Sequence, residues 1–281
     1  MAINWYPGHI AKAERKLKEQ VKLVDVVFEV LDGRIPESSM YDNLGSLLGN
    51  KPRLMLLNKS DVADPETNSK WMKYLEETSC KKVIMTSATT GKDISSVIKE
   101  ALLLGQPEID KLIAKGRLPR PIRAMVVGMP NVGKSSIINK LIKTAKVKVG
   151  AKAGVTRSAQ WVRIHPKLEL MDTPGIIPMK LSSQERAVKL AMVNCVGEAA
   201  YDKIEVAKAL TDLIYERYPK FLCDYYKLTC TEAPSVEDIA IARNLLLPGG
   251  KFDIDRCASL ILTDFRQGRI GRITLEDTPQ V

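Results

Sequence analysis

Apolar and polar residues alternate over the first 171 residues in the manner of strands that take turns with helices. Short β-branched and aliphatic runs are separated by longer amphipathic stretches, and glycine, proline, aspartate or asparagine marks many of the junctions. We expect strands at 23–31, 54–57, 83–85, 122–127, 160–164 and 168–171. We expect helices at 8–22, 65–78, 93–115 and 135–143. This alternation predicts an α/β fold with a doubly wound, mostly parallel sheet, whose ligand loops lie at the carboxyl ends of the strands.

The pattern changes after about Leu181. Helical spacing dominates the remainder, and only 269–275 carries a strand signal; the helical stretches are 183–195, 201–217, 235–246 and 254–266. We therefore expect an α/β domain over 1–181 and a smaller all-helical domain over 182–281. No run of 18 or more apolar residues occurs, so no transmembrane segment is expected.

One junction between a strand and a helix carries a phosphate-binding signature. Residues 128–135 are Gly-Met-Pro-Asn-Val-Gly-Lys-Ser, which fits the P-loop pattern between the strand at 122–127 and the helix that follows. The glycines let backbone amides face phosphate oxygens, the lysine reaches the β- and γ-phosphates, and the serine hydroxyl suits Mg²⁺. A glycine turn without a ligand is the less favoured alternative. We expect nucleotide contacts from Asn131, Val132, Gly133, Lys134, Ser135 and Ser136.

Two further motifs indicate a guanine nucleotide. Asn58-Lys59-Ser60-Asp61 follows the strand at 54–57, and the Asp61 carboxylate can accept hydrogen bonds from N1–H and the exocyclic amine of guanine. Adenine lacks this donor pair, which argues against a metabolic phosphotransferase that uses ATP. Asp172-Thr173-Pro174-Gly175 follows the strand at 168–171; its aspartate suits the Mg²⁺ shell and the Gly175 N–H suits the γ-phosphate. Alone, the first motif fits a surface turn equally well, but with the P-loop it predicts GTP binding. Weaker support comes from Ser87 and Ala88, whose amides would approach the guanine oxygen.

The order of these motifs resembles that of circularly permuted GTPases, since the guanine motif precedes the P-loop. The opening Trp5-Tyr6-Pro7-Gly8-His9-Ile10-Ala11-Lys12-Ala13 and the helical C-terminal part resemble the bacterial ribosome biogenesis GTPase A (YlqF) group, over essentially the whole chain. The resemblance implies a circularly permuted Ras-like P-loop domain. It also implies an assembly factor for the late large ribosomal subunit, which binds its precursor and rRNA with GTP and leaves on hydrolysis.

The resemblance also assigns roles to single residues. Many GTPases orient the attacking water with a Gln after the Asp-x-x-Gly glycine, but Ile176 stands there and cannot form a hydrogen bond. The family implies that His9 takes over this catalytic role, with Lys134 and Asn131. Asn131 would coordinate K⁺, and Thr156 would join Ser135 and Asp172 around Mg²⁺. Slow intrinsic hydrolysis, accelerated by ribosomal subunits, is the corresponding expectation.

The distribution of charge supports a polyanionic partner. Between Lys111 and Leu168 there are fourteen Lys and Arg residues and no Asp or Glu, within a chain of net charge +10. Residues 182–281 hold 13 basic and 15 acidic residues, a net of −2, so the excess lies in the first 181. This favours a polyanionic partner such as RNA over a solvated basic face, and no DNA partner is expected. An alternative function is a nucleotide-stabilised RNA chaperone in which hydrolysis is incidental.

Cysteine usage and the first residues bear on the compartment. The five cysteines are widely spaced without a Cys-x-x-Cys pair, which predicts free thiols in a reducing compartment. The opening residues lack the charged and apolar regions of a secretory signal. We expect a cytoplasmic monomer, although an organelle stroma or matrix would give the same pattern.

Overall fold

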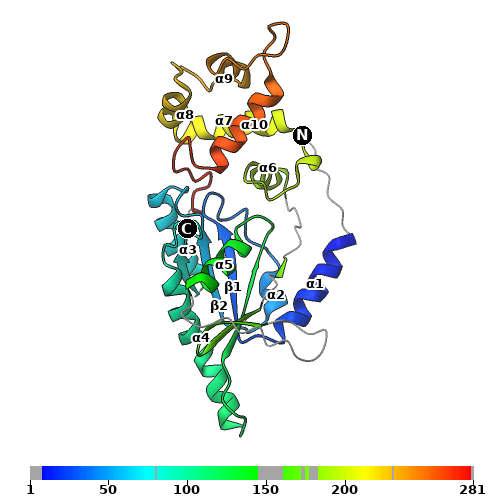
Figure 1. Cartoon of the computed structure of the whole chain (residues 1–281), viewed down its shortest axis with the longest axis vertical. Helices are drawn as coiled ribbons and strands as arrows, with labels where there is room; N and C mark the ends of the chain where they lie inside the picture. The colour runs from blue at the N-terminus through cyan, green and yellow to red at the C-terminus, as the bar shows by residue number, and fades with distance from the viewer. Residues whose placement is uncertain are drawn as a thin grey trace.

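A sheet with helices on both faces forms the body of the molecule, and a group of helices stands at one end of it (Figure 1). The structure, a computed structural model, describes residues 8–79, 81–144, 161–171, 175–176, 183–229 and 231–279. The strands are β1 (Val26–Asp32), β2 (Arg53–Asn58), β3 (Lys82–Met85), β4 (Ile122–Gly128), β5 (Trp161–His165), β6 (Leu168–Met171) and β7 (Gly175–Ile176). The helices of the body are α1 (Gly8–Val21), α2 (Leu44–Leu48), α3 (Pro65–Ser79), α4 (Ile94–Ala114) and α5 (Lys134–Thr144).

The sheet has the strand order β3-β2-β1-β4-β6-β5, and β7 pairs with β4 outside this path. All neighbouring strands run parallel except β5 and β6, which are antiparallel. The predicted α/β class with a mostly parallel sheet is therefore confirmed. Because β1, β2, β3 and β4 run in the same direction, the loops that follow them meet at one edge of the sheet.

Helices cover both faces of β1, which explains why all seven of its residues are buried. Val26, Phe28 and Val30 belong to the apolar cluster that includes residues of α4 and α5. Val27 packs in a second cluster with α1 and α2, and Leu31 packs in a third with α3. Successive side chains of a strand point to opposite faces, so a strand in this position is mostly apolar on both faces, and the buried Glu29 within it pairs with Arg53 at 2.9 Å.

The predicted helix after Asp64 shows how local signals set an element's start. The Asp64 carboxylate accepts a hydrogen bond from the Thr67 N–H at 2.8 Å, and Pro65 occupies the first helical position of α3. An aspartate at this site satisfies a backbone donor that the helix itself leaves open, and proline there gives up no hydrogen bond. These two residues were sufficient to predict where α3 begins.

The helical region comprises α6 (Gln184–Met192), the 3₁₀ turn η1 (Glu198–Ala200), α7 (Lys203–Arg217), α8 (Pro219–Tyr226), α9 (Val236–Ala242) and α10 (Ile254–Arg266). Four of these helices match the predicted stretches, whereas α8 was not predicted. Part of this region's apolar core is continuous with the cluster that includes α4 and α5. The boundary expected between residues 181 and 182 stays a prediction.

The segment after α10 is not the strand that was predicted for 269–275. It forms no strand ladder and instead returns to the body, where it ends beside α3 (Figure 1). The Ile273 N–H donates to the Val62 carbonyl at 3.1 Å, and the Leu275 N–H donates to the Arg34 carbonyl at 2.8 Å. β-branched residues suit an extended backbone, but here loops rather than a strand edge provide the hydrogen-bond partners.

The cysteines and the lengths of the helices bear on the expected compartment. Cys195 and Cys257 are free and buried, but Cys223 is disulfide-bonded, so the prediction of five free thiols is wrong. The cysteine spacing carried no signal for that bond. Within the described ranges, no helix is both long and apolar enough to cross a bilayer.

Candidate functional site

Asn58 joins three of the predicted motifs at the carboxyl edge of the sheet. Its side-chain amide donates to the Val132 carbonyl at 2.9 Å, which connects the end of β2 to the P-loop. Its side-chain oxygen accepts the Ala88 N–H at 3.3 Å and the Thr86 hydroxyl at 3.4 Å, in the loop after β3. Asn58 is 1% exposed, so these bonds form away from solvent. The guanine motif, the Ser87–Ala88 pair and the phosphate loop are therefore brought together by one side chain.

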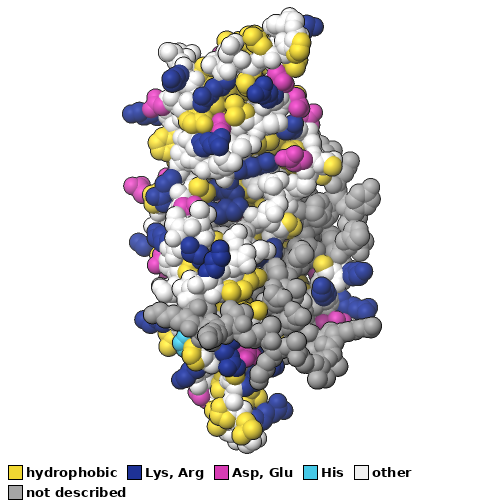
Figure 2. All heavy atoms as spheres, in the orientation of Figure 1, with side chains coloured by type: hydrophobic (Ala, Val, Ile, Leu, Met, Phe, Trp, Pro, Cys, Tyr) yellow, Lys and Arg dark blue, Asp and Glu magenta, His cyan; other side chains and the backbone are white. Residues whose placement is uncertain are grey.

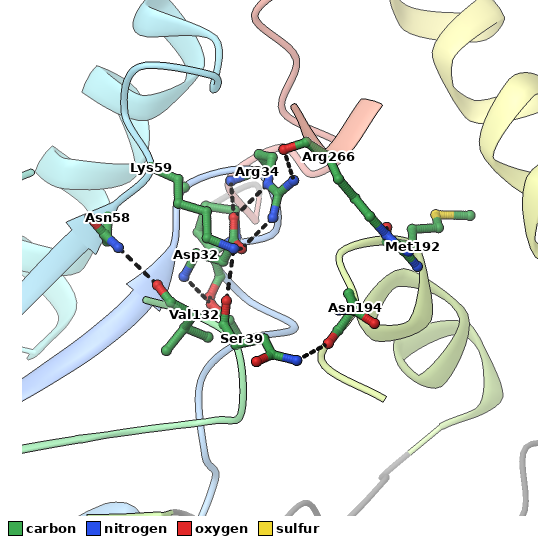
Figure 3. Close-up of polar contacts among 12 residues, drawn as sticks. Asp32, Arg34, Ser39, Asn58, Lys59, Val132, Met192, Asn194 and Arg266 are labelled. Atoms are coloured by element: carbon green, nitrogen blue, oxygen red, sulfur yellow. Dashed lines mark hydrogen bonds and ion pairs between the residues drawn. The ribbon is translucent and has the colours of Figure 1, made fainter. Parts of the chain in front are cut away.

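Lys59 is held across the same edge (Figure 3). Its ammonium donates to the Asn131 carbonyl at 2.8 Å and lies 2.8 Å from the Asp32 carboxylate. The backbone of Lys59 has φ +63, an uncommon conformation for a residue with a side chain. These contacts direct the Lys59 side chain from the guanine motif towards the P-loop. The carboxylate of the motif, Asp61, is half-buried.

Asp32 and Arg34 form a buried ion pair that the sequence interpretation did not assign to the site. Two guanidinium nitrogens of Arg34 donate to the Asp32 carboxylate, at 2.9 and 2.8 Å, and both side chains are 1% exposed or less. Burial raises the pKa of Asp32, but the charges of Arg34 and Lys59 outweigh this effect and hold its pKa below the ordinary value. The one signal that the sequence offers for this pair is the Asp32-Gly33-Arg34 turn at the end of β1.

The two P-loop glycines occupy positions that exclude a side chain. Gly128 has φ +157, and a Cβ there would lie 2.6 Å from the Val30 carbonyl oxygen. Gly133 has φ +102, and a Cβ there would lie 2.2 Å from the side-chain nitrogen of Asn58. The second glycine is thus required both for the turn and for the packing of the guanine motif against the loop.

Lys134 begins α5 and is buried within the P-loop, where its ammonium donates to the Met129 carbonyl at 2.5 Å. Burial lowers its pKa to about 8. Among the described residues no carboxylate forms a salt bridge with it. A buried cation without a counter-charge is unfavourable, so this loop fits an anionic ligand such as a phosphate. Ser135 and Ser136 follow it as exposed residues in the first turn of α5.

Asn131 contacts the helical region. It has φ +58, and its side-chain amide donates to the carbonyl of Asn194, which follows α6, at 2.6 Å. The P-loop is therefore attached through Asn131 to both Lys59 and the end of α6. An asparagine in a turn often bonds to its own loop, but this side-chain nitrogen bonds to Asn194 instead.

A second connection to the helical region starts from Arg34. Its guanidinium donates to the Arg266 carbonyl at the end of α10, at 3.3 Å, and lies over the Phe265 ring with 5.4 Å to the centroid. Arg266 in turn donates to the Met192 and Ala191 carbonyls at 2.9 Å each, which satisfies the end of α6 (Figure 3). Arg266 thus has its hydrogen-bond partners inside the protein.

The remaining predicted residues lie only partly within the described structure. Gly175, in β7, pairs with Val127 of β4, which places it beside the start of the P-loop, and α1 contacts β7. Thr156 and Asp172 lie outside the described residues. His9 lies in the first turn of α1, but its side chain is also outside the described part of the chain. The proposed roles of these three residues stay predictions.

Comparisons with known proteins agree with this arrangement. A family model described as "50S ribosome-binding GTPase" matches residues 123–219. The ribosome biogenesis GTPase A of Priestia megaterium is 38% identical to this chain, over 99% of it and 97% of that protein. The Thermotoga maritima protein of the same name is 35% identical, over 98% of this chain and 94% of its own length.

Solved structures show the same likeness. A crystal structure of GNP-bound YlqF from T. maritima has a TM-score of 0.66 and 29% identity, and it covers 96% of this chain and 100% of that one. A GDP-bound YlqF structure has a TM-score of 0.68 and 27% identity, over 95% and 100%. Both similarities extend over the α/β body and the helical region together.

Proposed function

The chain belongs to the ribosome biogenesis GTPase A (YlqF) family, and from this premise we propose that it is a GTPase that acts late in assembly of the large ribosomal subunit. It binds the precursor and its rRNA in the GTP state and leaves on hydrolysis. The observation that supports this most directly is the set of Asn58 hydrogen bonds, which unites a guanine motif with a phosphate loop. The motif order, with 58–61 before 128–135, corresponds to a circular permutation of the GTPase domain.

In this proposal Asp61 reads the base and the P-loop binds the phosphates. Asp61 accepts hydrogen bonds from guanine, while Asn58 and Lys59 hold its motif against the loop. Lys134 supplies the positive charge that the phosphates neutralise, and the amides of Val132 and Gly133 face them. Ser135, Thr156 and Asp172 would hold Mg²⁺, which neutralises phosphate charge when bound. Asn131 would hold K⁺ near the phosphates.

Hydrolysis requires an oriented water, and the chain lacks the usual glutamine for it. Ile176 follows Gly175, so we assign this role to His9, whose helix α1 contacts β7. An imidazole can accept a hydrogen bond from water at near-neutral pH. The helix must be placed correctly for this, so we expect turnover to be slow for the protein alone and faster with the ribosomal partner.

The RNA partner is supported by the exposed charge of α1 rather than by the whole basic run. Lys12, Arg15, Lys16, Lys18 and Lys22 are exposed around α1, while Leu17 and Val21 are buried. Within the run at 111–168, in contrast, several charges have acidic partners in the folded chain, namely Lys111 with Glu108, Arg120 with Asp25, and Arg123 and Arg163 with Glu169. On the face drawn in Figure 2, Lys and Arg side chains recur from the helical region to the opposite tip.

The test is GTP turnover with and without large ribosomal subunits or their precursors, in K⁺ and in Na⁺. We expect stimulation of roughly 10³–10⁵-fold by the partner, as in GTPases that complete their catalytic set on binding. His9→Ala should retain GTP binding but lose most of the stimulation, and Na⁺ should lower the rate. Equal turnover with and without subunits would contradict the proposal. A His9→Ala variant that loses turnover but still supports assembly in cells would favour the RNA chaperone.

A further inference from the structure

The segment 268–276 contacts the loop that carries Asp61, through residues that come before and after Asp61 in the sequence. The guanidinium of Arg272 donates to the Ser60 carbonyl at 2.7 Å and to the Ala63 carbonyl at 3.1 Å. The Ile273 N–H donates to the Val62 carbonyl at 3.1 Å. Residues 60, 62 and 63, which flank Asp61, are thus all bonded to one segment that lies more than 200 residues away in the sequence.

The turn between α10 and this segment packs on the same loop. Gly268 has φ +69, and a Cβ at this position would lie 2.6 Å from a methyl carbon of Val62. Thr274, which is fully buried, bridges the neighbouring loops: its hydroxyl donates to the Gly33 carbonyl at 3.0 Å and accepts the Asp64 N–H at 3.1 Å. The segment therefore ties the loop after β2 to the loop after β1.

Between Ser60 and Ala63, two backbone hydrogen bonds to other residues of the body are found among the described residues. The Val62 N–H donates to the Lys59 carbonyl at 3.0 Å, and the Ser60 N–H donates to the Thr86 carbonyl at 3.1 Å. The carbonyls of residues 60, 62 and 63 each accept a hydrogen bond from the segment 268–276. A carboxylate that must accept two hydrogen bonds from one base needs its position fixed within a fraction of an ångström.

We propose that Arg272, with the backbone of Ile273, is a positioning element for guanine recognition that acts through Asp61. The proposal rests on the function proposed above, in which Asp61 pairs with the base. Holding the loop in its bound conformation before the nucleotide arrives lowers the entropy lost on binding. Release of the loop should weaken the contact to the exocyclic amine, which depends on orientation, more than the phosphate contacts at the opposite end of the site.

The test compares GDP with inosine diphosphate, which lacks the exocyclic amine, by calorimetric titration of the full chain. Arg272→Ala should weaken GDP binding by about tenfold, the order of one to two lost hydrogen bonds, and should narrow the preference for GDP over inosine diphosphate. Arg272→Lys, which keeps a donor to one carbonyl, should restore part of that preference. Arg256→Ala removes an exposed arginine from α10 and serves as the matched control, with wild-type values expected.

The outcomes separate this inference from the proposed function. If the wild type prefers GDP and Asp61→Asn removes the preference, but Arg272→Ala keeps the wild-type ratio, the positioning role is wrong and the function stands. If the wild type does not prefer GDP over inosine diphosphate, or if Asp61→Asn keeps this preference, both the positioning role and the proposed reading of guanine by Asp61 are wrong. Should Arg272→Ala not fold, Arg272→Lys, which loses one of the two carbonyl contacts, is measured instead, and an unchanged ratio overturns the inference.

Discussion

At the residue scale, the environment of Lys134 indicates that its site binds an anionic ligand. Its ammonium is buried at the start of α5, and its partner is a backbone carbonyl of its own loop. Burial disfavours the charged form, which lowers its pKa to about 8. A bound phosphate favours the charged form, so the nucleotide and the proton bind cooperatively.

GDP affinity should therefore fall as the pH rises through about 8. Below this pH Lys134 is already charged, so GDP affinity should not change with pH. Above it, GDP binding requires the lysine to take up a proton, so affinity should fall by up to tenfold for each pH unit. The measurement is the dissociation constant of GDP from pH 7.5 to 9.5. Lys134→Arg stays charged over this range and should give a flatter profile. A level profile in the wild type would show that Lys134 does not titrate on binding.

At the scale of elements, the loop after β1 attaches the helical region to the body through several contacts. Arg34 contacts the end of α10, and Arg186 of α6 donates to the Ser38 carbonyl at 3.0 Å and to Asp42 at 2.9 Å. Glu276, which is buried, accepts hydrogen bonds from the backbone of the same loop, with the Glu37 N–H at 2.8 Å. One loop thus serves both the nucleotide edge and the helical region.

Replacing Arg34 should reveal the energetic weight of this attachment. Arg34→Met leaves the buried Asp32 with Lys59 alone and removes the bond to α10, so we expect a loss of roughly 3–5 kcal/mol in the free energy of unfolding. Urea denaturation gives this value. Arg15→Met removes an arginine whose pair with Glu19 is exposed on α1, and it should change stability by less than about 1 kcal/mol. Equal effects of the two changes would show that burial of the Asp32 pair is unimportant.

The main elements of the body were predictable because their signals are local. The buried strands are continuous apolar runs, and α3 carries its own cap at Asp64. Elements without a strong local signal were missed: α2 has five residues, β7 has two, and α8 starts at a proline directly after α7. The strand predicted at 269–275 was wrong because its neighbours are loops, which a residue pattern does not reveal.

The candidate site divides in the same way. Asn58, Asp61 and Lys134 belong to short motifs whose chemistry is recognisable from residue type and spacing. Asp32 and Arg34 were not recognised, because their importance comes from Lys59 and from Arg266, which is 232 residues from Arg34. Contacts over such separations depend on the complete fold, and one sequence alone carries no direct signal for them.

At the scale of the whole molecule, charge is divided between a basic body and a helical region of slightly negative balance. The lysines of α1 lie on the exposed side of a helix that is anchored by Leu17 and Val21. Helix α1 also contacts β7, the strand that holds Gly175. RNA phosphates bound along α1 would therefore lie on a helix that touches this strand.

Binding to large ribosomal subunits should weaken steeply with salt, by ~0.7–0.9 logarithmic units per phosphate contact for each tenfold rise in salt. The triple variant Lys16→Ala, Lys18→Ala and Lys22→Ala should lower this slope by roughly one for each lysine that contacts phosphate. Sedimentation at several KCl concentrations measures it. Lys208→Ala, on an exposed position of α7, should keep the wild-type slope. An unchanged slope in the triple variant would exclude these three lysines from the RNA interface.

The contact between Arg272 and Ser60 also has a consequence in time. The two residues are 212 positions apart, so during synthesis the loop that carries Asp61 is made long before the segment 268–276 that contacts it. At ~5–20 residues per second, the interval is about 10 to 40 s. Once the phosphate loop at 128–135 has also been made, the nascent chain would hold both motifs for the rest of that period without the segment that positions Asp61. Translation itself would then delay full guanine selectivity until α10 and the segment after it have been made and have folded back onto the body.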